Sequence, residues 1–359
     1  MNDIKRIIQR LSNSNGISGY EDSVREVLRG EIGKYVDEIR EDALGNLITV
    51  KNAQNSSESL EYSKKKVMLA AHMDEIGLMA KYIDEKGFIR FVGIGGWFDQ
   101  SLLNTRVVLH GEKGPILGVI GSKPPHLMKK EDEKKPIKLD DMFIDIGAKN
   151  EKEVDEAGIK RGTPITLDMV SKDLLNNRIT GKAFDNRAGL TVMIEAMKRV
   201  RAKCTIYAVG TVQEEVGLKG ARTSAFGLDP DLALAIDTTI PGDHPGIEKK
   251  ESPIEIDKGP AITVADASGR GLLAPKKVIE WLTETAEDNN IPYQLDVSDG
   301  GTTDATAIHL TRAGIPSSVI SIPTRYIHSQ VEVLSLDDID NCAELIARSL
   351  ENIERYFNG

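Results

Sequence analysis

Four short, continuously apolar runs constrain the fold of this chain more than any other feature of its sequence. A strand that is apolar at every position, instead of every second one, must be covered on both faces, which is typical of strands inside a mostly parallel sheet. Helical patterns lie between the runs, notably at 187–200 and 276–290, where apolar residues recur at threes and fours. The runs are VMLAA (67–71), TIYAVG (205–210), LALAI (232–236) and SSVISI (317–322). This alternation predicts an α/β domain whose mixed, mostly parallel sheet is flanked by helices.

The N-terminal region predicts a helix over about residues 20–33, because apolar residues recur there at helical spacing. Ser18 and Glu21 are spaced as a capping box at its start. A strand is expected over residues 47–50, after a Gly-Asn turn signal, and the polar stretch 52–66 is expected to be a surface loop.

The middle of the chain has a different pattern. Residues 78–173 contain short segments punctuated by glycine, with turn signals at near-regular intervals, which favours a small β-barrel or sandwich. A charged stretch at 124–141 is expected to be a long exposed loop. Since 359 residues exceed what one hydrophobic core usually serves, we expect two domains. We expect the α/β domain to comprise 1–77 plus 174–359, and the inserted barrel domain to comprise 78–173.

Composition excludes several classes of partner and location. The formal net charge of -10 argues against binding to a nucleic-acid backbone, which needs a basic surface. No apolar run approaches the roughly 20 residues that span a bilayer, and the first residues lack a secretory signal, so we expect a cytoplasmic protein without a membrane partner. Cys204 and Cys342 are too few for a disulfide framework, and we interpret them as buried packing residues.

Acids and histidines follow the four apolar runs. His72 and Asp74 come directly after the first run, Glu214 and Glu215 follow the second, and Asp237 and His328 follow the third and fourth. Side chains at the carboxyl ends of strands in an open α/β sheet meet in one crevice. Asp185, within GKAFDNRAG and just ahead of a predicted helix, can point into the same crevice.

Two histidines and three carboxylates form a donor set that suits zinc, cobalt or manganese. Five donors exceed the needs of one catalytic zinc ion, so the set favours two ions. A carboxylate that bridges ions about 3.5 to 4 Å apart would let the pair polarise a carbonyl and lower the pKa of a shared water. Peptide hydrolysis is the natural use of such a centre.

Each residue also has a simpler interpretation when it is taken alone. His72 could be a structural histidine, Glu214 and Glu215 surface charge, and Asp185 and Asp237 helix caps. Together these coincidences are improbable. Adjacent residues of an extended segment point to opposite sides, so one of the two glutamates could ligate while its neighbour handles a proton. Structural or solvent roles are expected for the other histidines, which are His110, His126, His244 and His309.

The motifs resemble one known family along the whole chain. They occur in the order AAHMDEIG (70–77), GKAFDNRAG (181–189), TVQEEVGLKGA (211–221), AIDTT (235–239), GGTTDA (300–305) and PTRYIHS (323–329). This series is similar to that of the metallo-aminopeptidases with a dinuclear metal site that include the tetrahedral or TET aminopeptidases and the bacterial glutamyl and deblocking aminopeptidases. The resemblance implies that Asp185 bridges two divalent ions. Zinc or cobalt is expected, and manganese is the alternative. His72 and Asp237 would complete one ion's protein ligands, and Glu215 and His328 the other's.

The same resemblance implies the remaining roles. Glu214 would be the general base that deprotonates a metal-bridging water and later delivers a proton to the leaving amine, while Asp74 would orient His72. The barrel insertion would serve dimerisation. Such dimers would be the building blocks of homo-oligomers, including a hollow tetrahedral dodecamer. The substrates would be peptides.

Other functions stay open at this point. A related metal-dependent carboxypeptidase or deacylase could use the same centre, although the only candidates for a carboxylate-binding arginine are Arg270 and Arg325. A cellulase-type glycosidase would use paired carboxylates but would not need the histidines. A non-catalytic shell protein is disfavoured by the intact Glu214. The preferred N-terminal residue of the substrate and the native metal are not encoded in any motif, although 265–275 and 300–308 are expected near the specificity pocket by resemblance.

Overall fold

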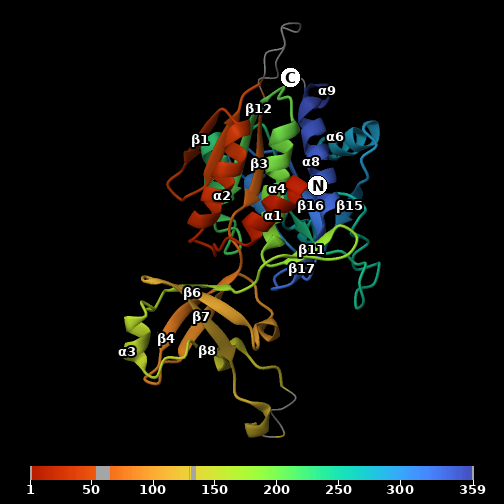
Figure 1. Ribbon diagram of the computed structural model, residues 1–359. Helices are drawn as coiled ribbons and strands as arrows, with labels where there is room; N and C mark the ends of the chain where they lie inside the picture. Colours follow the sequence, from red (N-terminus) through yellow and green to blue (C-terminus); the bar gives the residue numbers. More distant parts are fainter. Residues whose placement is uncertain (1, 54–64, 129, 131–134, 358–359) are drawn as a thin grey trace.

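The computed structural model describes residues 2–53, 65–128, 130 and 135–357. Its larger part is built on one mixed sheet, shown in Figure 1. The strands follow the order β1 (Glu38–Glu41), β2 (Leu47–Lys51), β12 (Thr205–Thr211), β3 (Lys66–His72), β13 (Leu232–Thr239), β16 (Ser317–Arg325), β17 (Glu332–Ser335), β11 (Arg178–Gly181) and β10 (Lys172–Asp173), with β14 (Ala261–Ala265) beside β16 and β15 (Gln294–Val297) beside β14. The four predicted apolar runs are β3, β12, β13 and β16, which are parallel neighbours at the centre of the sheet. The predicted α/β class is therefore confirmed.

Helices cover both faces of the central strands, which explains why these strands are apolar throughout. In β3, Val67 and Leu69 pack into the core beneath one group of helices, whereas Met68 and Ala70 face the opposite group. The first group comprises α1 (Asn2–Ser12), α2 (Asp22–Ile32), α4 (Phe184–Arg199), α6 (Lys276–Asp288), α8 (Leu336–Glu351) and α9 (Ile353–Tyr356), and the second comprises α5 (Lys219–Leu228) and α7 (Asp304–Ile308). Within the described residues, no helix combines the length and apolarity needed to cross a membrane.

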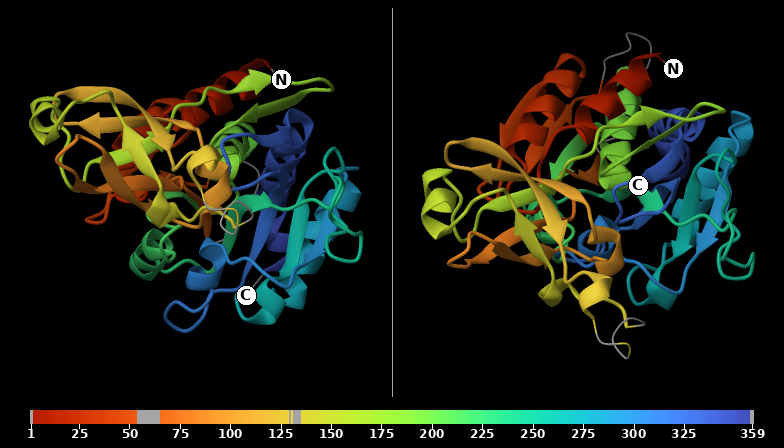
Figure 2. Two further views of the ribbon diagram at one scale, coloured as in Figure 1. Left: turned by 90° about the horizontal axis from the view of Figure 1, so that it is seen from below. Right: turned by 60° about the horizontal axis from the view of Figure 1, so that its bottom comes forward.

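The middle of the chain forms a closed antiparallel barrel with its own apolar core. Its strands are β4 (Gly77–Ile83), β5 (Ile89–Ile94), β6 (Arg106–Gly111), β7 (Gly114–Gly121), β8 (Phe143–Asp145) and β9 (Pro164–Leu167), and α3 (Glu151–Glu156) precedes β9. The barrel lies below the larger sheet in Figure 1, and Figure 2 turns this end toward the viewer. The inserted barrel is confirmed, whereas the limits 78–173 stay a prediction. Parts of the two expected loops, 54–64 and 129 with 131–134, lie outside the described residues.

The first junction between the sheet and the barrel is short and buried. Only four residues separate His72, the last residue of β3, from Gly77, the first of β4. Glu75 in this link forms buried ion pairs with Lys182 at 2.7 Å and Arg187 at 3.3 Å. A Cβ on Gly77 would lie 2.0 Å from the Ile17 side chain, so no larger residue fits there. The link is therefore held tightly on both sides.

The capping box predicted for Ser18 and Glu21 is wrong. Helix α2 begins at Asp22, as expected within the limits of such a prediction, but no side chain caps its first turn. The Ser18 hydroxyl instead donates to Asp74 Oδ2 at 2.6 Å, and Glu21 Oε1 accepts the backbone N–H of Gln213 at 3.1 Å. Both residues brace the loops at the carboxyl edge of the sheet rather than the helix.

Candidate metal centre

The two histidines of the predicted ligand set face one shared carboxylate. His72 Nε2 lies 3.2 Å from Asp185 Oδ1, and His328 Nε2 lies 3.3 Å from Asp185 Oδ2. Asp237 Oδ1 is 3.8 Å from His72 Nε2, and Glu215 Oε2 is 3.3 Å from His328 Nε2. The structure thus brings together all five residues as two groups of donors that meet at Asp185.

Local backbone geometry explains how these side chains converge. His72 is on the same face of β3 as Met68 and Ala70, because alternate residues of a strand share a face. Asp237 lies inside β13, so the interpretation of this residue as a helix cap does not hold. Asp185 is in the first turn of α4 but has non-helical dihedral angles, φ -77 and ψ 102. His328 follows β16 in a left-handed conformation with φ 61.

The two adjacent glutamates lie in a turn, which corrects the expectation of an extended segment. Gln213 has a left-handed conformation with φ 55, and the backbone N–H of Gly217 donates to the Glu214 carbonyl at 2.9 Å. Glu214 Oε2 lies 3.9 Å from His72 Nε2, while Glu215 approaches His328. The two carboxylates therefore separate toward different histidines because the chain turns, not because a strand alternates.

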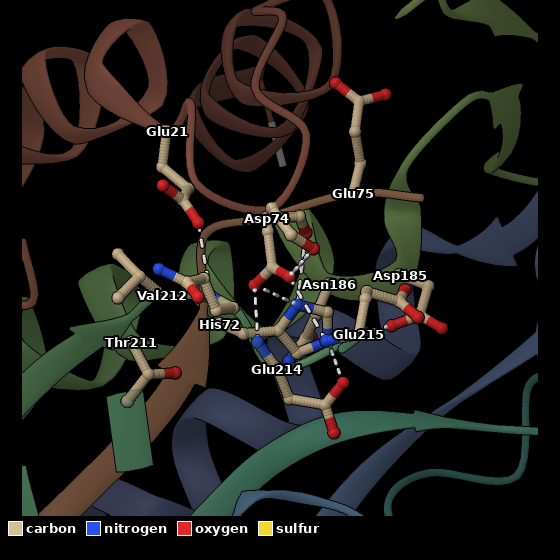
Figure 3. A network of polar contacts seen from close by, with 12 residues as sticks. Glu21, His72, Asp74, Glu75, Asp185, Asn186, Thr211, Val212, Glu214 and Glu215 are labelled. Carbon is tan, nitrogen blue, oxygen red and sulfur yellow. Dashed lines mark hydrogen bonds and ion pairs between the residues drawn. The ribbon is translucent and has the colours of Figure 1, made fainter. Parts of the chain in front are cut away.

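Asp74 holds the turn that carries these glutamates, as Figure 3 shows. Its Oδ1 accepts the backbone N–H of Glu214 at 3.0 Å, and its Oδ2 accepts that of Glu215 at 3.1 Å. The Nδ1 atom of His72 lies 3.1 Å from the Asp74 backbone carbonyl and 3.5 Å from its carboxylate. Asp74 thus contacts the ring through both its backbone and its side chain, and its shortest contact is to Ser18.

Glu332, the first residue of β17, is a site residue that the sequence analysis missed. It is buried, and its two carboxylate oxygens accept the backbone N–H of Asp185 at 3.0 Å and of His328 at 3.1 Å. One side chain therefore fixes two predicted ligands that are far apart in the sequence. Its place four residues after His328 was the available signal, but a single acid near a strand start predicts nothing specific.

Glu332→Gln is expected to weaken metal binding by about 10- to 100-fold, the usual cost of losing an outer partner of a ligand. The amide offers only one oxygen, so one of the two backbone N–H groups would face an NH₂ donor. Titration of the metal-free protein with zinc measures the effect. The control is Glu38→Gln on β1, which changes the same functional group at an exposed position, and equal zinc affinity of both variants would contradict the positioning role.

The donor spacing fits metal ions. Atoms that coordinate zinc tetrahedrally at 2.0 to 2.2 Å are about 3.3 to 3.6 Å apart. Three of the four histidine-to-carboxylate distances among the five predicted ligands, at 3.2, 3.3 and 3.3 Å, are close to this range. Glu215 Oε1 is buried without a hydrogen-bond partner among the described residues, and Asp185 Oδ1 has none in hydrogen-bonding geometry. Among the described residues, two sets of three have donor atoms within 4.8 Å of one another, namely His72 with Asp185 and Glu215, and His72 with Glu214 and Asp237. These sets share His72 and do not include His328.

Electrostatics at the centre also favour cations. Burial raises the pKa of both Glu214 and Asp237 well above the ordinary value, against the opposing influence of His72. Burial opposes protonation of His328, but Asp185 and Glu215 outweigh it and raise the pKa of this histidine to about 11. The carboxylates thus repel one another, and against the effect of burial they raise the pKa of both histidines. Divalent ions would relieve this excess of negative charge.

The centre opens into a cavity of about 1290 Å³ lined by His72, Asp185, Glu214, Glu215, Asp237 and His328, among others. The other four histidines, for which structural or solvent roles are expected, do not line this cavity. His110 Nε2 lies 2.8 Å from the Thr166 hydroxyl in the barrel, and His244 Nδ1 lies 3.1 Å from the Pro245 carbonyl in an exposed loop. Gly96 of the barrel does line the cavity, and a Cβ at this position would lie 3.3 Å from His328 Nδ1.

Comparisons with known proteins show the family to which this chain belongs. The model of the M42 glutamyl aminopeptidase family matches residues 45–345. A curated putative aminopeptidase from Acetivibrio thermocellus is 40% identical over 97% of this chain and 98% of its own length. An aminopeptidase from the archaeon Desulfurococcus kamchatkensis has a solved structure that is 42% identical, with a TM-score of 0.91 over 98% of this chain and 95% of that chain. The TET1 peptidase of Pyrococcus horikoshii, which can assemble into a tetrahedron or a large octahedral shell, is 31% identical, with a TM-score of 0.84 over 99% of this chain and 100% of that chain. The chain therefore belongs to the M42 glutamyl aminopeptidase family.

Proposed function

We propose that this protein is a two-metal aminopeptidase that hydrolyses the N-terminal residue from peptides. The observation that carries this proposal is the shared carboxylate, since Asp185 turns one oxygen toward His72 and the other toward His328. With Asp237 beside His72 and Glu215 beside His328, each half of the centre offers a histidine and a carboxylate of its own. Two zinc or cobalt ions, or manganese, suit this mixed set of donors.

The chain's own residues supply positioning and proton transfer. When bound, a pair of divalent ions polarises a substrate carbonyl and lowers the pKa of a water. Glu214 takes the proton from the attacking water and passes it to the nitrogen of the leaving peptide. The Glu214 carboxylate is not the one closest to His72 or to His328, which leaves it available for proton transfer. Burial raises the pKa of Glu214 and so favours its taking up a proton. Asp74 holds Glu214 and Glu215 in place through their backbone N–H groups.

A carboxypeptidase would need a cation for the terminal carboxylate of its substrate, and both candidate arginines are engaged elsewhere. Arg325 forms a two-pronged ion pair with Asp243, at 2.9 and 2.7 Å. Arg270 is exposed and donates to the Ala267 carbonyl at 3.2 Å. Neither lines the cavity. A cellulase-type function is disfavoured by the peptidase family, and by histidines that glycoside hydrolysis does not require.

We also propose a homo-oligomer in the cytoplasm, with a dimer formed through the barrel domain 78–173 as its building block and a tetrahedral dodecamer as one assembly. The shell assembled by the Pyrococcus horikoshii relative supports this proposal. Leu117 and Val119 on β7 are apolar and exposed on the barrel, where a partner subunit could cover them.

Activity on aminoacyl anilides tests the function. We expect hydrolysis of substrates with a free α-amine, little hydrolysis of their N-acetylated forms, and loss of activity in a chelator that added zinc or cobalt restores. Preferred cleavage of N-acetylated substrates would favour a deacylase, and release of C-terminal residues a carboxypeptidase. Activity that survives complete removal of metal would contradict the proposed chemistry.

A further inference from the structure

The wall of the cavity beyond the ligand set and Glu214 is strongly acidic. Four carboxylates line it, and we refer to Glu251, Asp266, Asp296 and Asp299 as the acidic wall. Among the described lysines and arginines, only Lys250 lines the cavity. Its ammonium group lies 2.6 Å from Glu248 Oε2, outside the acidic wall, and its side chain is 77% exposed. The wall therefore keeps a net negative charge of its own, separate from that of the metal centre.

Asp296 links this wall to the metal centre. Thr239 lies two residues beyond Asp237 on the same face of β13, and its hydroxyl donates to Asp296 Oδ2 at 3.1 Å. Asp296 is only 7% exposed, and no described cation forms an ion pair with it. Burial raises its pKa, and the bond from Thr239 offsets only part of this effect. A buried carboxylate without a cationic partner is costly unless a ligand supplies one.

Asp266 gives a second, independent sign of a missing cation. It is 5% exposed, and its Oδ1 accepts the backbone N–H of Leu272. Its Oδ2 is buried and has no hydrogen-bond partner among the described residues. Protein interiors rarely leave a carboxylate oxygen unsatisfied, and a ligand group is one reason for such an exception.

We propose that the acidic wall, with Asp296 and Asp266 as its buried members, recognises the cationic side chain of an N-terminal lysine or arginine. This inference rests on the proposed aminopeptidase function and names its substrate class. Ile240 and Val297 also line the cavity and expose apolar surface, along which the methylenes of a long basic side chain can pack. A glutamyl side chain would be repelled by the wall, and a neutral one would leave the buried carboxylates unpaired.

Hydrolysis of lysyl, arginyl, norleucyl and glutamyl anilides by the metal-loaded protein tests the substrate class. Norleucine keeps the length of lysine's aliphatic chain without its charge. We expect the highest kcat/KM for lysyl and arginyl substrates and the lowest for glutamyl. A norleucyl or glutamyl preference would overturn the acidic subsite and leave the aminopeptidase function intact. If no aminoacyl anilide is hydrolysed, the function fails and the subsite fails with it.

Asp296→Asn separates recognition of the side chain from recognition of the α-amine, which is also cationic. We expect the ratio of lysyl to norleucyl kcat/KM to fall about tenfold, the effect of losing one charge-assisted contact. Equal losses on both substrates would mean that Asp296 binds the α-amine, and would overturn the proposal. Asp266→Asn provides a second variant if Asp296→Asn does not fold. The control Asp288→Asn removes one charge from the exposed surface of α6, where this residue pairs with Arg355, and should leave the ratio unchanged.

Discussion

Glu214→Gln is expected to lower kcat by about 10²- to 10⁴-fold, the usual contribution of a positioned general base. Glutamine keeps the size and shape of the side chain, so the fold and both metal ions should be retained. The amide cannot accept a proton from water at neutral pH, and the proton for the leaving amine is lost with it. Steady-state hydrolysis of an aminoacyl anilide measures the loss, and turnover like that of the parent would remove Glu214 from the mechanism.

Metal content must be measured on the same Glu214→Gln sample. The Glu214 carboxylate lies 3.9 Å from His72 Nε2 and shares a group of donors with His72 and Asp237, so its position is also compatible with a ligand. Two ions per chain together with low turnover would support proton transfer. Loss of one ion would instead assign Glu214 to the ligands. The control is Glu26→Gln on α2, which changes the same functional group on the exposed surface.

Asp185→Ala is expected to abolish binding of at least one metal ion, because both halves of the proposed centre depend on this carboxylate. Removing it also leaves His72 and His328 without their shared partner. Elemental analysis of the purified variant after dialysis against zinc gives the number of ions per chain. We expect no measurable hydrolysis by this variant.

The Asp185→Ala experiment is paired with Asp173→Ala, which removes an exposed aspartate that pairs with Lys5. Circular dichroism shows whether either variant is folded. A folded Asp185→Ala protein that retains two ions per chain would rule out the bridging assignment, whereas one remaining ion per chain would show that one half of the centre binds metal without this carboxylate.

The central sheet could be predicted from the sequence because a strand that is buried on both faces is apolar at every position. Continuous apolar runs such as 67–71 can arise in few other ways, and the acids that follow them then meet at one edge. The residues that support the metal centre show no comparable sequence pattern. Glu332 acts on Asp185 and His328 only because β17 folds back beside β16, and that pairing depends on tertiary contacts.

Two errors at the sequence level have the same physical origin. Ser18 and Glu21 match the local rule for a helix start, but the tertiary fold offers them Asp74 and Gln213 as partners. Similarly, Glu214 and Glu215 follow a strand, yet the chain turns at Gln213 because these N–H groups meet the Asp74 carboxylate. Local spacing thus predicted a helix cap that does not form, and an extended backbone for two glutamates that lie in a turn.

The junction between sheet and barrel determines how this protein can be re-engineered. Residues 73–76 include Asp74, which holds the turn at Glu214, and Glu75, which forms ion pairs at the start of α4. A chimaera that replaces the barrel must therefore keep this link intact. Gly77 must also stay glycine because of Ile17. The return path, between the end of β9 at Leu167 and the start of β10 at Lys172, includes the exposed Val170. The linker sequence can therefore be varied at Val170, whereas the buried Ser171, whose backbone N–H donates to Asn13 Oδ1, and the whole first junction have to be kept unchanged.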